Sequence, residues 1–427
     1  MFDRRWLGVC AGVVCLAAGV TAQQGTGLKD PVLAKAEAIH ARALTIDTHV
    51  DMRNGDYGVL TPGQKCDLVK MKQGGLKAVF LAVFVGQRQV FDAAAYKTAY
   101  DSAMKQFEFL HVLTEKTHPE LCGFATSPED VERIAKTGKR VILTGVENGY
   151  PVGEDLANVK AFFDQGARYI TLTHSGHNQL GDSSSDRNPP LHGGLSPFGK
   201  QVVAEMNRIG LMIDVSHIAP SSFRDVITLT KAPIIASHSG CKAVNDVDRN
   251  LDDEQLKALS KNGGVVQIVA LASYLKAEAP ERAEAVRALR EELGMPAGGR
   301  GGRQGGPPAQ SLTPEQQAEA QKRREAYMER MKEIDAKFPA ASLADYANHI
   351  DYAVKVAGID HVSIGTDFDG GGGFPGFNDH SEALNVTVEL VRRGYSEKDI
   401  DKIWGANLLR VWRDVRKEAE REQKTAW

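Results

Sequence analysis

The sequence has few cysteines and no surplus of basic residues. Five of its 427 residues are cysteine, and only Cys66, Cys122 and Cys241 follow the N-terminal segment. Their odd number and wide spacing match no zinc-finger pattern, and leave one disulfide among them open. The formal net charge is -3. The chain therefore lacks the positive charge that a nucleic-acid backbone or an anionic membrane surface requires, and we expect no nucleic-acid partner.

The chain also lacks an apolar run long enough to span a bilayer. Arg4 and Arg5 precede an apolar stretch at residues 6–20, and about 15 residues is short of the roughly 20 that a membrane helix needs. Val20-Thr21-Ala22 has the small residues of a signal peptidase site. We therefore expect residues 1–22 to be a signal peptide, and the mature protein to be periplasmic or secreted without a stable membrane anchor.

What is present is an ordinary globular composition, with 42% hydrophobic and 25% charged residues. Short runs rich in β-branched residues alternate with longer amphipathic stretches, such as residues 154–165 and 196–209. This is the pattern of βα units around a parallel sheet. The runs cover residues 44–48, 78–85, 141–146, 169–173, 211–215, 234–237, 265–269 and 362–366. Eight of them predict an α/β fold, a (β/α)8 TIM-like barrel over residues 30–427.

One segment departs from this alternation. Residues 272–340 are rich in Ala, Glu, Arg and Lys and are interrupted by a Gly-rich tract at residues 298–308. We expect solvated helices on both sides of a flexible surface loop.

Metal-competent side chains follow most of the predicted strands. In a barrel the carboxyl ends of all strands open onto one face. Each motif alone is weak evidence, but burying so many imidazoles and carboxylates at one mouth requires compensation, which bound cations would provide. The motifs are Asp47-Thr48-His49-Val50-Asp51, Gly145-Val146-Glu147-Asn148-Gly149, Leu172-Thr173-His174, Asp214-Val215-Ser216-His217, Ser237-His238-Ser239 and Gly365-Thr366-Asp367-Phe368-Asp369-Gly370.

Imidazoles and carboxylates without cysteine suit catalytic zinc, with manganese or cobalt as weaker alternatives. The donors exceed what one ion needs, so we expect two Zn²⁺ per chain. One ion would take His49, Asp51 and Glu147, and the other Glu147, His217 and His238. Glu147 is the expected bridge, because only a carboxylate has two oxygens to divide between two ions.

The six motifs, in this order, resemble those of the membrane dipeptidase (renal dipeptidase) family, metallopeptidase family M19, in its bacterial form. The resemblance covers roughly residues 40–415 without the insertion. It implies an amidohydrolase-type barrel that hydrolyses dipeptides, including those with a C-terminal D-residue, by a metal-bridging hydroxide. It also implies that His174 stabilises the oxyanion, that Arg249 binds the substrate carboxylate, and that Asp367 transfers protons. Homodimerisation, as in relatives, stays open.

Two other functions remain as alternatives: a lactonase or deacylase of the amidohydrolase type, and an exported metal-binding protein without catalysis. Two residues also keep a second interpretation. Arg249 could form a surface ion pair with Asp246 or Asp248. Asp369 could support a metal ligand or only shape a turn.

Overall fold

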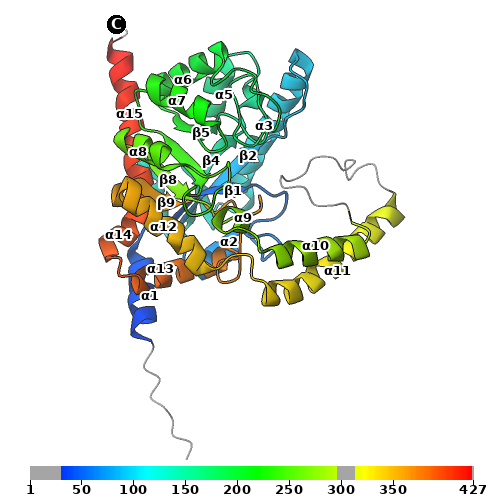
Figure 1. The fold of residues 1–427 in the computed structure, drawn as a ribbon. Helices are drawn as coiled ribbons and strands as arrows, with labels where there is room; N and C mark the ends of the chain where they lie inside the picture. Colours follow the sequence, from blue (N-terminus) through cyan, green and yellow to red (C-terminus); the bar gives the residue numbers. More distant parts are fainter. Residues whose placement is uncertain (1–29, 296–312, 426–427) are drawn as a thin grey trace, which may run out of the picture.

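The computed structural model describes residues 30–295 and 313–425. The predicted signal peptide and the Gly-rich tract at residues 298–308 lie outside these residues. The chain folds as a parallel β-barrel surrounded by helices (Figure 1). The sheet order is β1-β2-β4-β5-β6-β7-β8-β9. These strands are Ile46–Asp51, Ala78–Phe84, Arg140–Glu147, Ala167–Thr171, Met212–Asp214, Ile235–Ser239, Val265–Ile268 and Val362–Ile364. The predicted (β/α)8 barrel is thus confirmed.

The barrel closes between its first and last strands just beyond the end of β9. Asp367 donates its backbone N–H to the carbonyl of His49 at 2.9 Å, and Asp51 donates to the carbonyl of Phe368 at 2.9 Å. The buried Asp47 carboxylate of β1 adds bonds from the backbone and the hydroxyl of Thr366, at 2.9 and 2.6 Å. The first and last strands of the barrel are therefore joined next to the strand-end motifs.

Each of the eight predicted runs overlaps a strand, although some strands are shorter and others longer than predicted. The fourth run, expected at residues 169–173, is the strand Ala167–Thr171. Sequence analysis missed the short strand β3, Cys122–Phe124, which pairs in parallel with β4 outside the barrel path. Three residues are too few to show the alternation that identifies a strand in a sequence, so only the backbone pairing with β4 reveals it.

Most helices lie between consecutive strands and cover the barrel (Figure 1). Helix α6 shows how the sequence sets their ends: the Ser196 hydroxyl accepts the Gly199 N–H at its start, and Gly210 adopts a left-handed φ of 78° after its end. The helices besides those of the insertion are α1 Pro31–Arg42, α2 Leu68–Gly74, α3 Ala93–Val112, α4 Pro128–Lys136, α5 Ala157–Asp164, α6 Pro197–Ile209, α7 Pro220–Leu229, α8 Asp253–Lys261, α12 Leu343–Ala357, α13 Ala383–Arg392, α14 Glu397–Asp401 and α15 Asn407–Thr425.

The insertion forms helices α9 (Ala272–Leu275), α10 (Pro280–Glu292) and α11 (Pro314–Lys337). Helices α10 and α11 lie side by side and project from the barrel (Figure 1). Ion pairs join them, Arg282 to Asp335 at 2.9 Å and Arg330 to Glu292 at 3.0 Å. The structure places helix α10 before the glycine tract and helix α11 after it, with most of their described side chains exposed.

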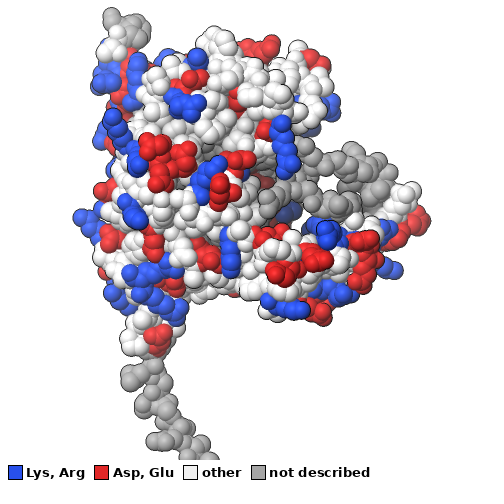
Figure 2. All heavy atoms as spheres, viewed as in Figure 1, with Lys and Arg blue, Asp and Glu red and all other residues white. Residues whose placement is uncertain are grey.

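The surface carries charges of both signs, and the three described cysteines lie in the interior. On the face shown in Figure 2, acidic and basic side chains are interspersed. Cys66, Cys122 and Cys241 are buried and unpaired, so no disulfide forms among them. Within residues 30–295 and 313–425, none of the helices combines the length and the apolar character that crossing a membrane demands.

Candidate metal centre and active site

The carboxyl ends of six barrel strands bring seven candidate side chains to one mouth. His49 and Asp51 come from β1, and Glu147 is the last residue of β4. His238 lies in β7, while His174, His217 and Asp367 each lie three positions after the end of β5, β6 and β9, respectively. Their donor atoms form overlapping groups, each within 4.8 Å: His49, Glu147 and His238; Glu147, His174 and His217; His49, Asp51 and Asp367.

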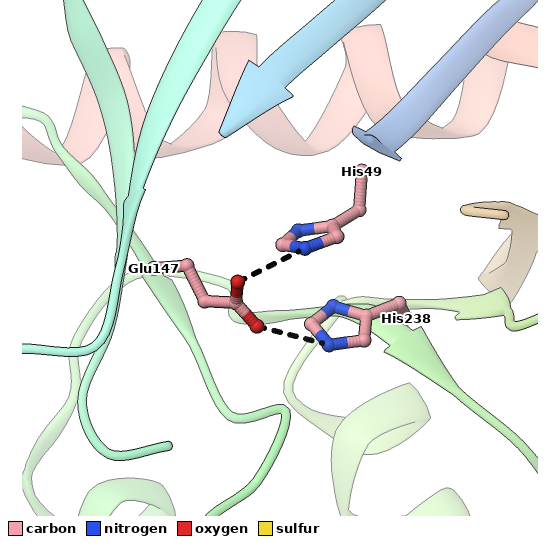
Figure 3. A group of neighbouring side chains, drawn as sticks. All are labelled: His49, Glu147 and His238. Carbon is pink, nitrogen blue, oxygen red and sulfur yellow. Dashed lines mark ion pairs between the residues drawn. The ribbon is translucent and has the colours of Figure 1, made fainter. Parts of the chain in front are cut away.

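Glu147 lies at the centre of this cluster and divides its two oxygens. Its Oε2 is 3.5 Å from Nε2 of His49, whereas its Oε1 is 3.2 Å from Nε2 of His217 and 3.4 Å from Nε2 of His238. Figure 3 shows the carboxylate between the His49 and His238 rings, one oxygen toward each. The side chain thus has the geometry of a carboxylate shared between two sets of donors.

The donor set fits a divalent metal. Nε2 of His49 and Oδ1 of Asp51 are buried but have no hydrogen-bond partner, and such atoms are costly unless something binds them. Burial holds the pKa of His217 and of His238 well below the usual value. Both imidazoles are therefore neutral near pH 7, so each has a lone pair to donate to a metal.

Hydroxyl groups orient two of the imidazoles by bonding to Nδ1, the ring nitrogen that does not face the cluster. Nδ1 of His49 is 3.0 Å from the buried Tyr169 hydroxyl. Nδ1 of His238 is 2.8 Å from the Ser237 hydroxyl, which donates to Asp214 at 2.6 Å. Partners of this kind set the ring orientation of a metal ligand. Sequence analysis missed Tyr169 in this role, because the contact crosses the barrel between strands that are not neighbours.

Asp369 does not join the cluster. Of its two interpretations, the structure favours the one in which it shapes the local backbone rather than supporting a metal ligand. Its carboxylate accepts the backbone N–H groups of Lys65 and Cys66, at 3.0 and 3.1 Å, and lies 3.4 Å from Nε of Arg53. Asp369 therefore anchors the loop after β1. His380, to which the sequence assigned no role, also has a structural one: its Nε2 lies 2.7 Å from the buried carboxylate of Asp47.

Arg249 lies beside the cluster as a buried cation, 5% exposed. Its guanidinium donates to the His238 carbonyl at 2.9 Å and to the Ser239 hydroxyl at 3.2 Å, while Nε has no acceptor. The alternative surface ion pair with Asp246 or Asp248 is wrong, because those carboxylates pair with Lys242. Among the described residues no acid pairs with Arg249.

Tyr274 is a site residue that sequence analysis missed. It lies on α9, the first turn of the insertion, and its ring centroid is 5.5 Å from Cζ of Arg249. Burial raises the pKa of its phenol; the Arg249 guanidinium opposes this shift, and the carboxylates of Asp367 and Glu147 add to it. An isolated tyrosine at the start of a charged, Ala-rich segment gave no signal for a place in the site.

His174 and Asp367 lie at the same mouth of the barrel, and burial shifts the pKa of each toward its neutral form. Burial lowers the pKa of His174, so its ring is neutral near pH 7. Its Nδ1 is 3.1 Å from the Ser175 hydroxyl, and its Nε2 is 3.6 Å from Glu147 Oε1. If Ser175 donates, Nε2 carries the proton toward the cluster. Burial and then the charge of Asp51 raise the pKa of Asp367 well above the usual range, which favours a proton-donating carboxyl.

Residues 33–426 match the family model for membrane dipeptidase, peptidase family M19. The chain belongs to this family. A dipeptidase of Clonostachys rogersoniana, verJ, is 28% identical over 365 residues, which are 84% of this chain and 78% of that protein. The crystal structure of the probable dipeptidase PvdM from Pseudomonas aeruginosa is 34% identical, covers 91% of this chain and 99% of its own, and superposes with a TM-score of 0.76.

A solved metallopeptidase shares the fold at lower identity. The metallopeptidase from Rhodobacter sphaeroides, solved with a phosphinate mimic of the dipeptide L-Ala-D-Ala, is 21% identical over 87% of this chain and 99% of its own, with a TM-score of 0.66. The family and the barrel expected from the six motifs are thereby confirmed.

Proposed function

We propose that this chain is an exported zinc dipeptidase, which hydrolyses dipeptides with a free C-terminal carboxylate. The observation that carries the proposal is the buried guanidinium of Arg249, which has no acidic partner in the part of the chain that the structure describes, beside a cluster of metal donors centred on Glu147. A cation with unused N–H groups binds a carboxylate, and the donor cluster binds the ions that activate water. One small site therefore recognises one end of a substrate and cleaves the bond next to it.

Two zinc ions are proposed to bind here. His49, Asp51 and Glu147 would hold one, and Glu147, His217 and His238 the other, because Glu147 offers a separate oxygen to each set of imidazoles. When bound, two such ions supply a water nucleophile of lowered pKa and withdraw charge from the substrate carbonyl. The absence of cysteine from the cluster agrees with a catalytic rather than a structural zinc site.

The protein groups then position the substrate and move its protons. Arg249 would hold the carboxylate with its unused N–H groups, and Tyr274 would cover the guanidinium. The neutral His174 would donate its Nε2 proton to the oxygen that becomes negative at the scissile carbonyl. Asp367, with its raised pKa, would give a proton to the leaving amine.

The carboxylate anchor lies directly against a cluster residue, because Arg249 donates to the His238 carbonyl at 2.9 Å, and this proximity favours short substrates. A third residue at the C-terminus would carry the carboxylate away from Arg249. The solved metallopeptidase from Rhodobacter sphaeroides that binds a mimic of L-Ala-D-Ala supports extending the proposal to dipeptides with a C-terminal D-residue.

The direct test is hydrolysis of a panel of L,L and L,D dipeptides by purified protein, before and after chelation. We expect turnover that chelation abolishes and about two equivalents of zinc per chain restore. Tripeptides and dipeptide amides serve as controls, because they lack a carboxylate at the required distance. Efficient turnover of lactones or acylated amines without a carboxylate would favour a lactonase or deacylase instead. Bound zinc without any turnover would indicate a metal-binding protein.

A further inference from the structure

A buried histidine outside the metal cluster joins two segments that border Arg249. His349 of α12 is fully buried. Its Nδ1 lies 3.0 Å from the backbone N–H of Cys241, and its Nε2 lies 2.9 Å from the carbonyl of Leu275. An amide N–H can only donate and a carbonyl can only accept. The ring is therefore neutral, with its proton on Nε2, and both nitrogens are used.

The first of these segments is the loop after β7, which carries Arg249. Cys241 begins this loop two residues after the strand. The loop returns to the strand end through the Arg249 guanidinium, which donates to the His238 carbonyl, and through Asn250, which accepts the Gly240 N–H at 3.0 Å. A shift of the backbone at Cys241 would therefore move the base on which Arg249 is placed.

The second segment is α9, the four-residue helix that carries Tyr274. The last carbonyls of a helix have no partners within it and need other donors. Three side chains supply them to consecutive carbonyls, Asn245 to Ser273 at 3.0 Å, Asn250 to Tyr274 at 2.8 Å and His349 to Leu275 at 2.9 Å. Two of the donors come from the Arg249 loop and the third from α12. The turn is thus fixed against the loop from two sides.

We propose that His349 is a positioning residue of the substrate-carboxylate pocket, which holds the Arg249 loop and the Tyr274 turn at a fixed separation. The inference rests on the dipeptidase function proposed above. It makes His349 act on binding of the substrate carboxylate and leaves the metal donors as they are. A buried hydrogen bond contributes about 1 kcal/mol to the geometry that it holds, so loss of either one should weaken substrate binding by up to about tenfold.

The chain offers a matched control for a merely structural role. His40 of α1 is also buried, and both of its ring nitrogens are bonded, Nδ1 to the Thr387 hydroxyl at 2.7 Å and Nε2 to the Gly74 carbonyl at 2.8 Å. None of these partners belongs to the Arg249 loop or to α9. Substitution at His40 should therefore disturb the fold to a similar degree without touching the pocket.

The experiment compares His349→Asn and His349→Gln with His40→Asn and His40→Gln in the zinc-loaded full chain. At His349, Asn keeps an acceptor near the position of Nδ1, and Gln keeps a donor near that of Nε2. The measurements are kcat and KM for a dipeptide, Kd for a phosphinate dipeptide mimic by calorimetry, zinc content and Tm. We expect both His349 variants to raise KM and Kd by up to about tenfold with kcat and zinc content within twofold of wild type.

The His40 variants are expected to lower Tm alone. Unchanged KM and Kd in the His349 variants, or an equal rise in the His40 variants, would overturn the positioning role. A wild-type protein that neither cleaves dipeptides nor binds the mimic would instead overturn the proposed function. A variant pair in which kcat and zinc content fall together would show that His349 supports the metal cluster rather than the pocket.

Discussion

Replacing Arg249 by lysine tests how this site recognises its substrate. Lysine keeps the positive charge but lacks the planar guanidinium. It therefore offers a point charge and cannot form the paired hydrogen bonds to a carboxylate. In the structure two N–H groups of Arg249 bond to His238 and Ser239, and Nε remains without an acceptor. The remaining N–H groups are the ones available to a carboxylate.

The magnitude follows from the bonds that the variant cannot make. A hydrogen bond to a charged group contributes about 1.5 to 3 kcal/mol. Loss of two such bonds, with partial compensation by the retained ammonium, should cost about 3 to 4 kcal/mol, or about 100- to 1000-fold in kcat/KM at 1.4 kcal/mol per tenfold. Arg249 is only 5% exposed, so this cost exceeds the roughly 0 to 1 kcal/mol that ion pairs on the protein surface contribute.

The assay compares kcat/KM for a dipeptide and for its C-terminal amide in wild type and in Arg249→Lys. The loss should be confined to the dipeptide, because the amide has no carboxylate to bind. Tm and zinc content are followed in parallel to show that the fold and the cluster persist. An equal loss on both substrates would refute the recognition argument and assign Arg249 to support of the His238 loop.

Three further predictions concern the metal cluster, the proton donor and stability. Glu147→Gln removes the charge shared by the two donor sets, so we expect bound zinc to fall below one equivalent per chain by elemental analysis; two retained equivalents would contradict the bridging role. Asp367→Asn should lower kcat by about 100- to 10,000-fold while Kd for a phosphinate dipeptide changes little, and a loss seen mainly in Kd would contradict proton transfer. Burial lowers the pKa of His40 to about 4, below the value near 6.5 in the unfolded chain, so the unfolded chain binds the proton first as pH falls. Urea unfolding of metal-free protein should therefore show stability that is present above about pH 6.5 and declines toward pH 4, and His40→Gln should flatten that decline.

The sequence predicted the barrel and the cluster because both depend on local order along the chain. Each motif directly follows an apolar run, and parallel strands bring such ends to one face, so His49 and Glu147 could be placed together without coordinates. Contacts across the barrel or between loops could not be predicted in this way. Tyr169 reaches His49 from a distant strand, and Tyr274 reaches Arg249 from an insertion. The role of Arg249 came from the family resemblance, since its own neighbours in sequence indicated a surface ion pair.

The seam between β1 and the segment after β9 has a consequence for biosynthesis. Asp367 bonds to the backbone of His49 there, although more than three hundred positions separate them in the chain. A nascent polypeptide that has not yet produced this last segment has an open barrel, in which the backbone at His49 and Asp51 lacks its bonds to Asp367 and Phe368. Tight capture of the proposed zinc ions should thus begin only when β9 and the segment after it dock, so zinc uptake would serve as a reporter of completed folding.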